Sequence, residues 1–126
     1  MKFEISISER KTYLNIRVKE AVTPDLLKEF IEKTANTSNK SGIHKFLFDL
    51  RQAPNQTPPI VHYDLVYDKS RELGFKPGSK HALLASLENR DDYSFVETIL
   101  LNAGYQSKIF TDEKDAIEWV EKIDLH

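Results

Sequence analysis

The chain has 126 residues, no cysteine and a formal net charge of -2 from 18 basic and 20 acidic residues. This length fits a single domain spanning residues 1–126. A domain of this size has one core and buries about two thirds of the surface of its unfolded chain. The near balance of charge argues against a general nucleic-acid binder. The absence of cysteine excludes disulfides, thiolate catalysis and cysteine-ligated metal sites.

The N-terminal segment alternates between apolar and polar residues. Phe3, Ile5 and Ile7 fall on one face, which is typical of a half-buried strand and not of a signal peptide. No stretch of the chain approaches the length of an apolar membrane span. We therefore expect a cytoplasmic protein without a membrane span.

A hairpin and a helix are predicted to follow in order. Residues 13–18 repeat the alternation of residues 3–7 after a short polar turn, which predicts two antiparallel strands. Thr23 and Pro24 then predict a helix start, with threonine as the N-cap and proline in the first turn. We expect this helix to end where the polar stretch 36–42 begins, because that stretch resembles a loop.

Residues 46–51, with the sequence FLFDLR, predict a buried strand that ends in a carboxylate and a guanidinium. A loop and a second helix follow, with the helix over residues 60–73 and Gly74 as its C-terminal stop. The short apolar run 81–85 predicts another buried parallel strand.

The rest of the chain repeats the strand and helix alternation. A third helix, capped by an aspartate of the Arg90-Asp91-Asp92 sequence, is expected to end at Gly104. A strand over residues 107–110 and a last helix capped by Asp112 complete the order ββαβαβαβα. This order predicts an α/β fold with a mixed, mostly parallel sheet and an antiparallel N-terminal strand at its edge.

Four pieces of this layout carry a family resemblance over nearly the whole chain. They are the opening hairpin, the helix entry TPDLL from Thr23, the FLFDLR strand and the ending IFTDEKDAIEWV from Ile109. Together they resemble the STAS-domain superfamily. The chain looks closest to the bacterial branch related to the sporulation anti-sigma-factor antagonist, which shares its architecture with CRAL-TRIO lipid-binding domains. The resemblance implies a STAS-like binding or regulatory module that is not an enzyme and has no cofactor.

Regulatory STAS members carry a phosphorylatable serine or threonine after the aspartate-bearing strand, usually directly after another aspartate. Residues 55–60 of this chain, NQTPPI, occupy that place. Thr57 is the only hydroxyl among them, and no aspartate precedes it. Thr57 is therefore the one phosphoacceptor candidate, and its position before two prolines favours the alternative of a helix N-cap.

Polar residues from two strand ends are predicted to meet at the carboxyl edge of the sheet, where such folds bind ligands. The candidates for ligand or partner binding are Asp49, Arg51, Thr57, His62 and Arg90. Asp49 and Arg51 share a strand face by the period of two, so a structural ion pair is the favoured interpretation for them.

A minor enzyme is one alternative function. His62 follows Thr57 by about one helical turn, and it could act as a general base oriented by Asp49. The four histidines, His44, His62, His81 and His126, lack the spacing of a metal site, and no metal is expected.

The helix predicted over residues 60–73 has more apolar side chains than a helix needs to pack one face against a core. Core packing is the favoured interpretation. A groove for a small apolar or lipid-like ligand is the second, and a homodimer patch containing Tyr63 and Tyr67 is the third.

Overall fold

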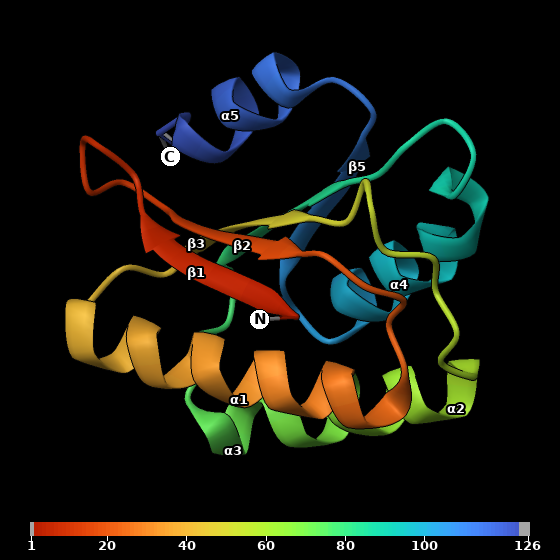
Figure 1. Ribbon diagram of the computed structural model, residues 1–126. Coiled ribbons are helices and arrows are strands. Elements are labelled where there is room, and N and C mark those ends of the chain that lie inside the picture. The colour runs from red at the N-terminus through yellow and green to blue at the C-terminus, as the bar shows by residue number, and fades with distance from the viewer. Residues whose placement is uncertain (1, 124–126) are drawn as a thin grey trace.

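The computed structural model describes residues 2–123, and its centre is a five-stranded sheet with helices on both faces (Figure 1). The strands lie side by side in chain order, and the first two are antiparallel while the others pair in parallel. The predicted fold class and order are confirmed. The strands are β1 (Phe3–Ile7), β2 (Leu14–Val18), β3 (Lys45–Asp49), β4 (Lys80–Leu84) and β5 (Gln106–Phe110).

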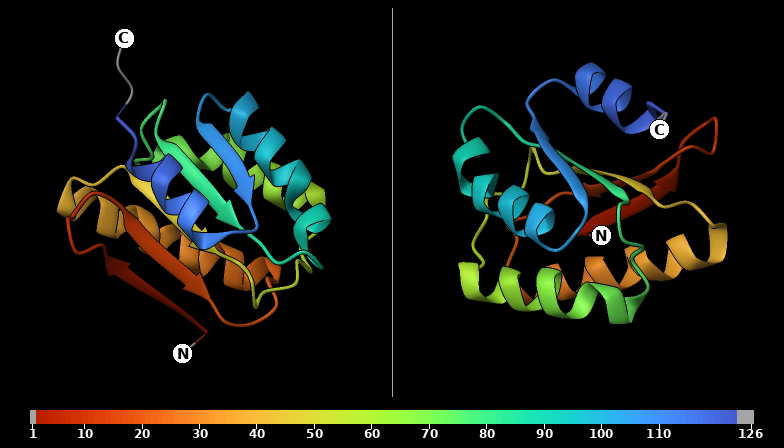
Figure 2. Two further views of the ribbon diagram at one scale, coloured as in Figure 1. Left: turned by 90° about the horizontal axis from the view of Figure 1, so that it is seen from above. Right: turned by 180° about the vertical axis from the view of Figure 1, so that it is seen from behind.

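Four helical segments connect or follow these strands. They are α1 (Pro24–Ser41), a composite segment made of α2 (Pro59–His62), η1 (Tyr63–Lys69) and α3 (Ser70–Leu73), then α4 (Arg90–Asn102) and α5 (Glu113–Glu121). We call residues 59–73 the covering helix. Figures 1 and 2 show α1 and the covering helix on one face of the sheet and α5 on the other. Helix α4 packs against η1 and β5, so it lies on the same face of the sheet as the covering helix.

The alternation of side chains along the central strands divides the core between the two faces. Phe46 and Phe48 of β3 belong to the large cluster beneath α1, the covering helix and α4. Leu47, which lies between them in sequence, belongs to a smaller cluster under α5. The face beneath the covering helix therefore contains most of the apolar core.

Helix boundaries follow local capping chemistry at several predicted positions. The Thr23 side chain accepts a hydrogen bond from the Leu26 backbone N–H at 3.3 Å, and Pro24 lies in the first turn. Asp112 caps α5 by accepting from the Asp115 N–H at 3.2 Å. Gly74 ends the covering helix with a φ of 105°, a left-handed conformation that glycine adopts readily. These three predictions are confirmed.

The loop predicted from residue 36 to residue 42 is wrong, because α1 continues to Ser41. Polar side chains in this part of the helix bond back to the chain. Thr37 donates to the Lys33 carbonyl, and buried Ser38 donates to the carbonyl of Ile43 just beyond the helix end. Gly42, with a φ of 75°, then ends the helix. A polar composition is compatible with a helix whose outer face is exposed to water.

The predicted aspartate cap of α4 is also wrong. The helix starts at Arg90, the cap position is occupied by Asn89, and no side chain accepts a bond from the first turn. Asp91 and Asp92 lie inside the first turn, where negative charge interacts favourably with the helix dipole.

The cap at Thr23 can be tested by substitution. We expect Thr23→Ala to lower the free energy of unfolding by about 1 kcal/mol, because the Leu26 N–H loses its acceptor. Thr37→Ala is the matched control, since Thr37 is a half-buried position in the interior of the same helix. Urea denaturation of both variants measures the difference. An equal change in the two variants would contradict the capping role.

Candidate functional site

Asp49 and Arg51 form a bidentate ion pair at the carboxyl end of β3. Arg51 Nε lies 2.9 Å from Asp49 Oδ1, and Arg51 Nη2 lies 2.8 Å from Asp49 Oδ2. The same Nη2 donates to Glu113 Oε2 of α5 at 2.9 Å. Hydrogen bonding to Asp49 raises the pKa of Arg51 above its ordinary value. The structural pairing predicted from sequence is confirmed, and it connects the end of β3 to the start of α5.

The structure places Thr57 inside the protein rather than at a helix cap. Its hydroxyl donates to the Val22 carbonyl at 2.7 Å, and the side chain is buried. The cap position of α2 is Pro58, which has no side-chain cap, so the predicted N-cap role of Thr57 is wrong. The prediction fails because the Val22 carbonyl lies within hydrogen-bond distance of the Thr57 hydroxyl, which binds it instead of the helix start. Transfer of a phosphoryl group to this oxygen requires the bond to Val22 to break.

His62 does not pair with Asp49 in the structure. Its Nε2 lies 3.0 Å from Asn55 Oδ1, whereas the Asp49 carboxylate is bound by Arg51. The side chain is almost wholly buried at the end of α2, and its Nδ1 has no hydrogen-bond partner. The structure therefore brings together Asp49 with Arg51, and separately His62 with Asn55.

Arg90 starts α4 and is exposed, while its neighbour Asn89 is buried and joins two loops. The Asn89 side-chain amide donates to the Leu50 carbonyl at 2.9 Å, and its oxygen accepts from the Ser86 N–H at 2.8 Å. Sequence reasoning missed Asn89 and Asn55. The available signal was the tendency of asparagine to bond loop backbone groups.

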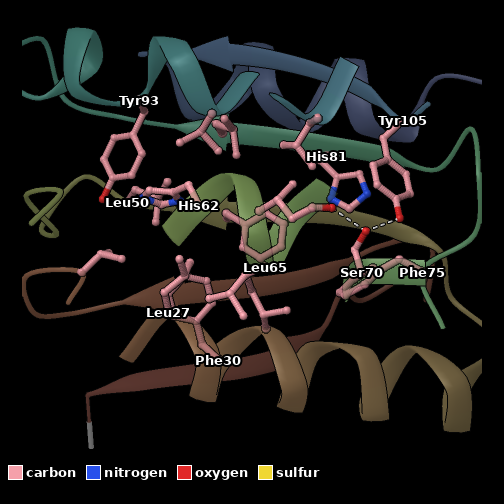
Figure 3. Close-up of a pocket in the computed structure, with 17 residues that line it drawn as sticks. Leu27, Phe30, Leu50, His62, Leu65, Ser70, Phe75, His81, Tyr93 and Tyr105 are labelled. Atoms are coloured by element: carbon pink, nitrogen blue, oxygen red, sulfur yellow. Dashed lines mark hydrogen bonds between the residues drawn. The ribbon is translucent and has the colours of Figure 1, made fainter. Parts of the chain in front are cut away.

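A cavity of about 60 Å³ lies between the sheet and the covering helix (Figure 3). Its walls come from α1, β3, β4, the covering helix and α4, and none of its lining residues is a lysine, arginine, aspartate or glutamate. Leu65 and Val66 of η1 are buried against it, whereas Ile60, Tyr63 and Tyr67 on the outer side are exposed. The covering helix is therefore partly core and partly the wall of a cavity.

The covering helix differs from the regular α-helix that its apolar spacing predicts. Its extent agrees with the prediction, but residues 63–69 form a π-helix. π-Helical segments are rare in proteins, and those that do occur are frequently found at functional sites. In its seven residues only Leu65 and Val66 are buried.

Two groups of polar side chains line the cavity, and Figure 3 shows them at opposite sides of the view. His62 lies in one group, near Leu50 and Tyr93. The other contains Ser70, His81 and Tyr105. Ser70 contacts the Tyr105 hydroxyl at 2.6 Å and donates to the Val66 carbonyl at 2.6 Å. Sequence reasoning missed this second group, since its members are far apart in the chain.

Burial keeps both cavity histidines neutral. Desolvation lowers the pKa of His62 from 6.5 to about 4 and the pKa of His81 from 6.5 to about 3. Neither ring carries charge near pH 7. The cavity is therefore uncharged.

Metal and membrane sites are not found in the part of the chain that the structure describes. Within residues 2–123, no group of three or more histidine, aspartate or glutamate side chains is placed to hold a metal ion. The same residues include no helix long and apolar enough to cross a membrane.

Comparison with known proteins defines the fold. No protein-family model matches the chain, and no curated protein matches it. A solved structure of an uncharacterized DUF3478-family protein with a SpoIIAA-like fold, from Shewanella loihica PV-4, is similar with a TM-score of 0.56. It is 18% identical, over 94% of this chain and 91% of that one.

The anti-sigma factor antagonist SpoIIAA in its unphosphorylated form is similar to the same degree. Its TM-score is 0.56 and its identity 18%, over 96% of this chain and 99% of that one. The resemblance predicted from the sequence is thus confirmed at the level of the fold, which is STAS-like.

The neutral state of the cavity histidines predicts a pH dependence. An unfolded histidine binds a proton below about pH 6.5, whereas His62 stays neutral in the folded state down to about pH 4. The free energy of unfolding therefore falls as the pH decreases through this window, by up to about 1.4 kcal/mol per pH unit for each such histidine. The ring C–H signals of His62 and His81 in NMR spectra should not move between pH 7.5 and roughly 5. A midpoint near 6.5 would show that the rings are solvated.

Proposed function

We propose that this protein is a non-catalytic binding module that holds a small, mainly apolar ligand in the cavity beneath the covering helix. The observation that carries the proposal is the cavity itself, whose lining residues are mostly apolar and include no lysine, arginine, aspartate or glutamate. Small-molecule sites are concave, mostly apolar and provided with a few polar groups, and this cavity has that composition. Within the STAS-like fold, it favours the carrier interpretation of the sequence.

The size of the cavity supports a compact ligand or the end of a longer one. Protein interiors are close-packed and contain few voids larger than a water molecule. The volume of about 60 Å³ has room for roughly four water molecules, but the apolar lining offers them few partners. An apolar group gains more from this space than water does.

The absence of a catalytic role is part of the proposal. Asp49 is held by Arg51, and His62 is held by Asn55, so the acid–base pair considered from sequence has no hydrogen bond in the described residues. General acid–base catalysis needs the two groups within direct or water-bridged reach of the same proton.

The carboxyl edge supports recognition of a protein partner as a second candidate function. Leu87, in the loop between β4 and α4, is 82% exposed, and Arg90 follows it at the start of α4. A large apolar side chain beside a cation is a suitable contact for a partner surface. The exposed Ile60, Tyr63 and Tyr67 favour a homodimer as the alternative partner. A cytoplasmic location agrees with either role and stays a prediction.

Filling the cavity should abolish ligand binding. We expect Val66→Phe to occupy the space, because Val66 is buried and lines it, at a cost of about 1–3 kcal/mol in stability. Tyr67→Phe is the matched control, since Tyr67 is the next residue of η1 and lies on the exposed side. Native mass spectrometry of mildly purified protein should show a bound small molecule in the wild type and in Tyr67→Phe, and none in Val66→Phe.

Two results would contradict the carrier function. One is a clean unliganded mass for the wild type in repeated preparations. The other is an identical bound mass in Val66→Phe, which would place the ligand elsewhere on the protein.

A further inference from the structure

We propose that this protein forms a symmetric dimer in which β1 pairs antiparallel with β1 of a second copy. The pairing joins the two sheets into one continuous sheet. The interface is the open side of β1, which consists of the backbone N–H and C=O groups of Phe3, Ile5 and Ile7. This surface lies apart from the cavity, so the dimer does not rest on the proposed function.

The hydrogen bonds between β1 and β2 show which backbone groups point away from the sheet. The Lys19 N–H donates to the Lys2 carbonyl at 2.9 Å, and the Ser8 N–H donates to the Tyr13 carbonyl at 3.0 Å. Both bonds extend the antiparallel register of β1 and β2 by one residue at either end. In such a pair, every second residue bonds the neighbouring strand. The even-numbered residues of β1 therefore face β2, and the odd-numbered residues present their backbone groups on the open side.

The two margins of the sheet differ, because only the one at β5 is covered. β1 is the first strand in the sheet order, with β2 beside it, and Figure 2 shows it at the outer margin. At the opposite margin, α4 packs against β5, and Glu97 of α4 accepts a hydrogen bond from the Ile109 N–H at 2.7 Å. A carboxylate thus occupies a donor that a further strand would need. Pairing through β1 leaves only covered margins, so the assembly closes at two copies.

β1 lacks the features by which natural proteins protect an unpaired strand. Such strands usually carry a proline, a bulge or a charged side chain that points inward. β1 has the sequence FEISI, follows β2 in an unbroken register, and packs Phe3 and Ile5 against the core. Its one charged residue, Glu4, lies on the other face and pairs with Lys19. Ile7 is 48% exposed, and a second strand beside β1 would cover it.

One register uses every backbone group on the open side. When Ile5 lies opposite Ile5 of the second copy, Phe3 lies opposite Ile7 of that copy. Each pair of odd-numbered residues then exchanges two backbone hydrogen bonds. The same register places phenylalanine beside isoleucine on one face, and aromatic with β-branched side chains is a favourable cross-strand combination. The open side of β1 is therefore complementary to itself.

Charge favours this register over the nearest alternatives. In it, Glu4 lies opposite Ser6 of the second copy. A shift by two residues in one direction places Glu4 opposite Glu4, and like charges directly opposite destabilise a sheet. The reverse shift places Phe3 opposite Glu9, which lies in the turn after β1, so Phe3 loses its strand partner. A shift by one residue opposes groups that already bond β2.

Sedimentation equilibrium tests the dimer. We expect wild-type monomers and dimers to exchange over roughly 0.01–1 mM, since one pair of strands is smaller than a standard interface. Ile5→Pro should raise the dissociation constant at least about tenfold, because proline has no N–H and two hydrogen bonds at the symmetry axis are lost. The fold does not use this N–H, and proline is tolerated at such positions of outer strands. Ile5→Val keeps the N–H and is the matched control, with wild-type association.

Cysteine cross-linking tests the register, and the natural chain contributes no background because it has no cysteine. Glu4→Cys and Ser6→Cys are prepared separately, at two exposed positions. In the proposed register they are directly opposite, with Cα atoms about 4.5 Å apart, which a disulfide can span. Two copies of one variant place their cysteines on a diagonal, roughly 7–8 Å apart, which is too far.

Oxidation of the mixed variants should therefore give the mixed disulfide dimer, and either variant alone should give little. Ser94→Cys, at an exposed position of α4, measures cross-linking by random collision. A single variant that cross-links as fast as the mixture would overturn the proposed pairing.

The dimer is refuted if the wild type stays monomeric at about 1 mM. It is also refuted if Ile5→Pro associates as tightly as the wild type, which would place the contact elsewhere, with the exposed Tyr63 and Tyr67 as the next candidate. If Ile5→Pro does not fold, Ile7→Lys decides in its place. It puts a charge opposite Phe3 of the second copy, leaves the backbone unchanged and should weaken association in the same direction.

Discussion

The covering helix is held at both ends by polar contacts, and the candidate site depends on this constraint. Just before the helix, the Thr57 hydroxyl donates to the Val22 carbonyl at 2.7 Å. At its other end, the Asn39 side chain of α1 donates to the Leu73 carbonyl at 3.1 Å. Between these points the π-helical segment η1 crosses the sheet face and buries only two apolar side chains. The cavity lies beneath the middle of the helix, between these two attachment points.

This arrangement explains why the polar groups of the protein divide into two sets with different roles. Asp49 and Arg51 lie in a partly solvated ion pair that joins the sheet to α5, and structural pairing accounts for both. His62 and His81 lie beneath the covering helix, where desolvation keeps them uncharged. The candidate site therefore lies under the covering helix rather than at the carboxyl edge of the sheet.

The sequence predicted the fold well because its signals are local. Strand alternation, the caps at Thr23 and Asp112, and the Asp49–Arg51 pair each depend on residues close together in the chain. The sequence favoured core packing at the covering helix over a ligand groove, because the walls of the cavity come from five separate elements and its volume depends on how they pack. Thr57 was misassigned for a related reason. The Val22 carbonyl that takes its hydroxyl lies 35 residues away in the chain.

The most direct test of this account is a crystal structure of the protein pressurised with xenon, which occupies apolar cavities. The account predicts xenon density between the sheet and η1, in contact with Val66 and Leu83 and absent from the rest of the core. A core without xenon at that place, with the side chains of η1 filling the space, would show that the covering helix is ordinary packing and would contradict the central claim.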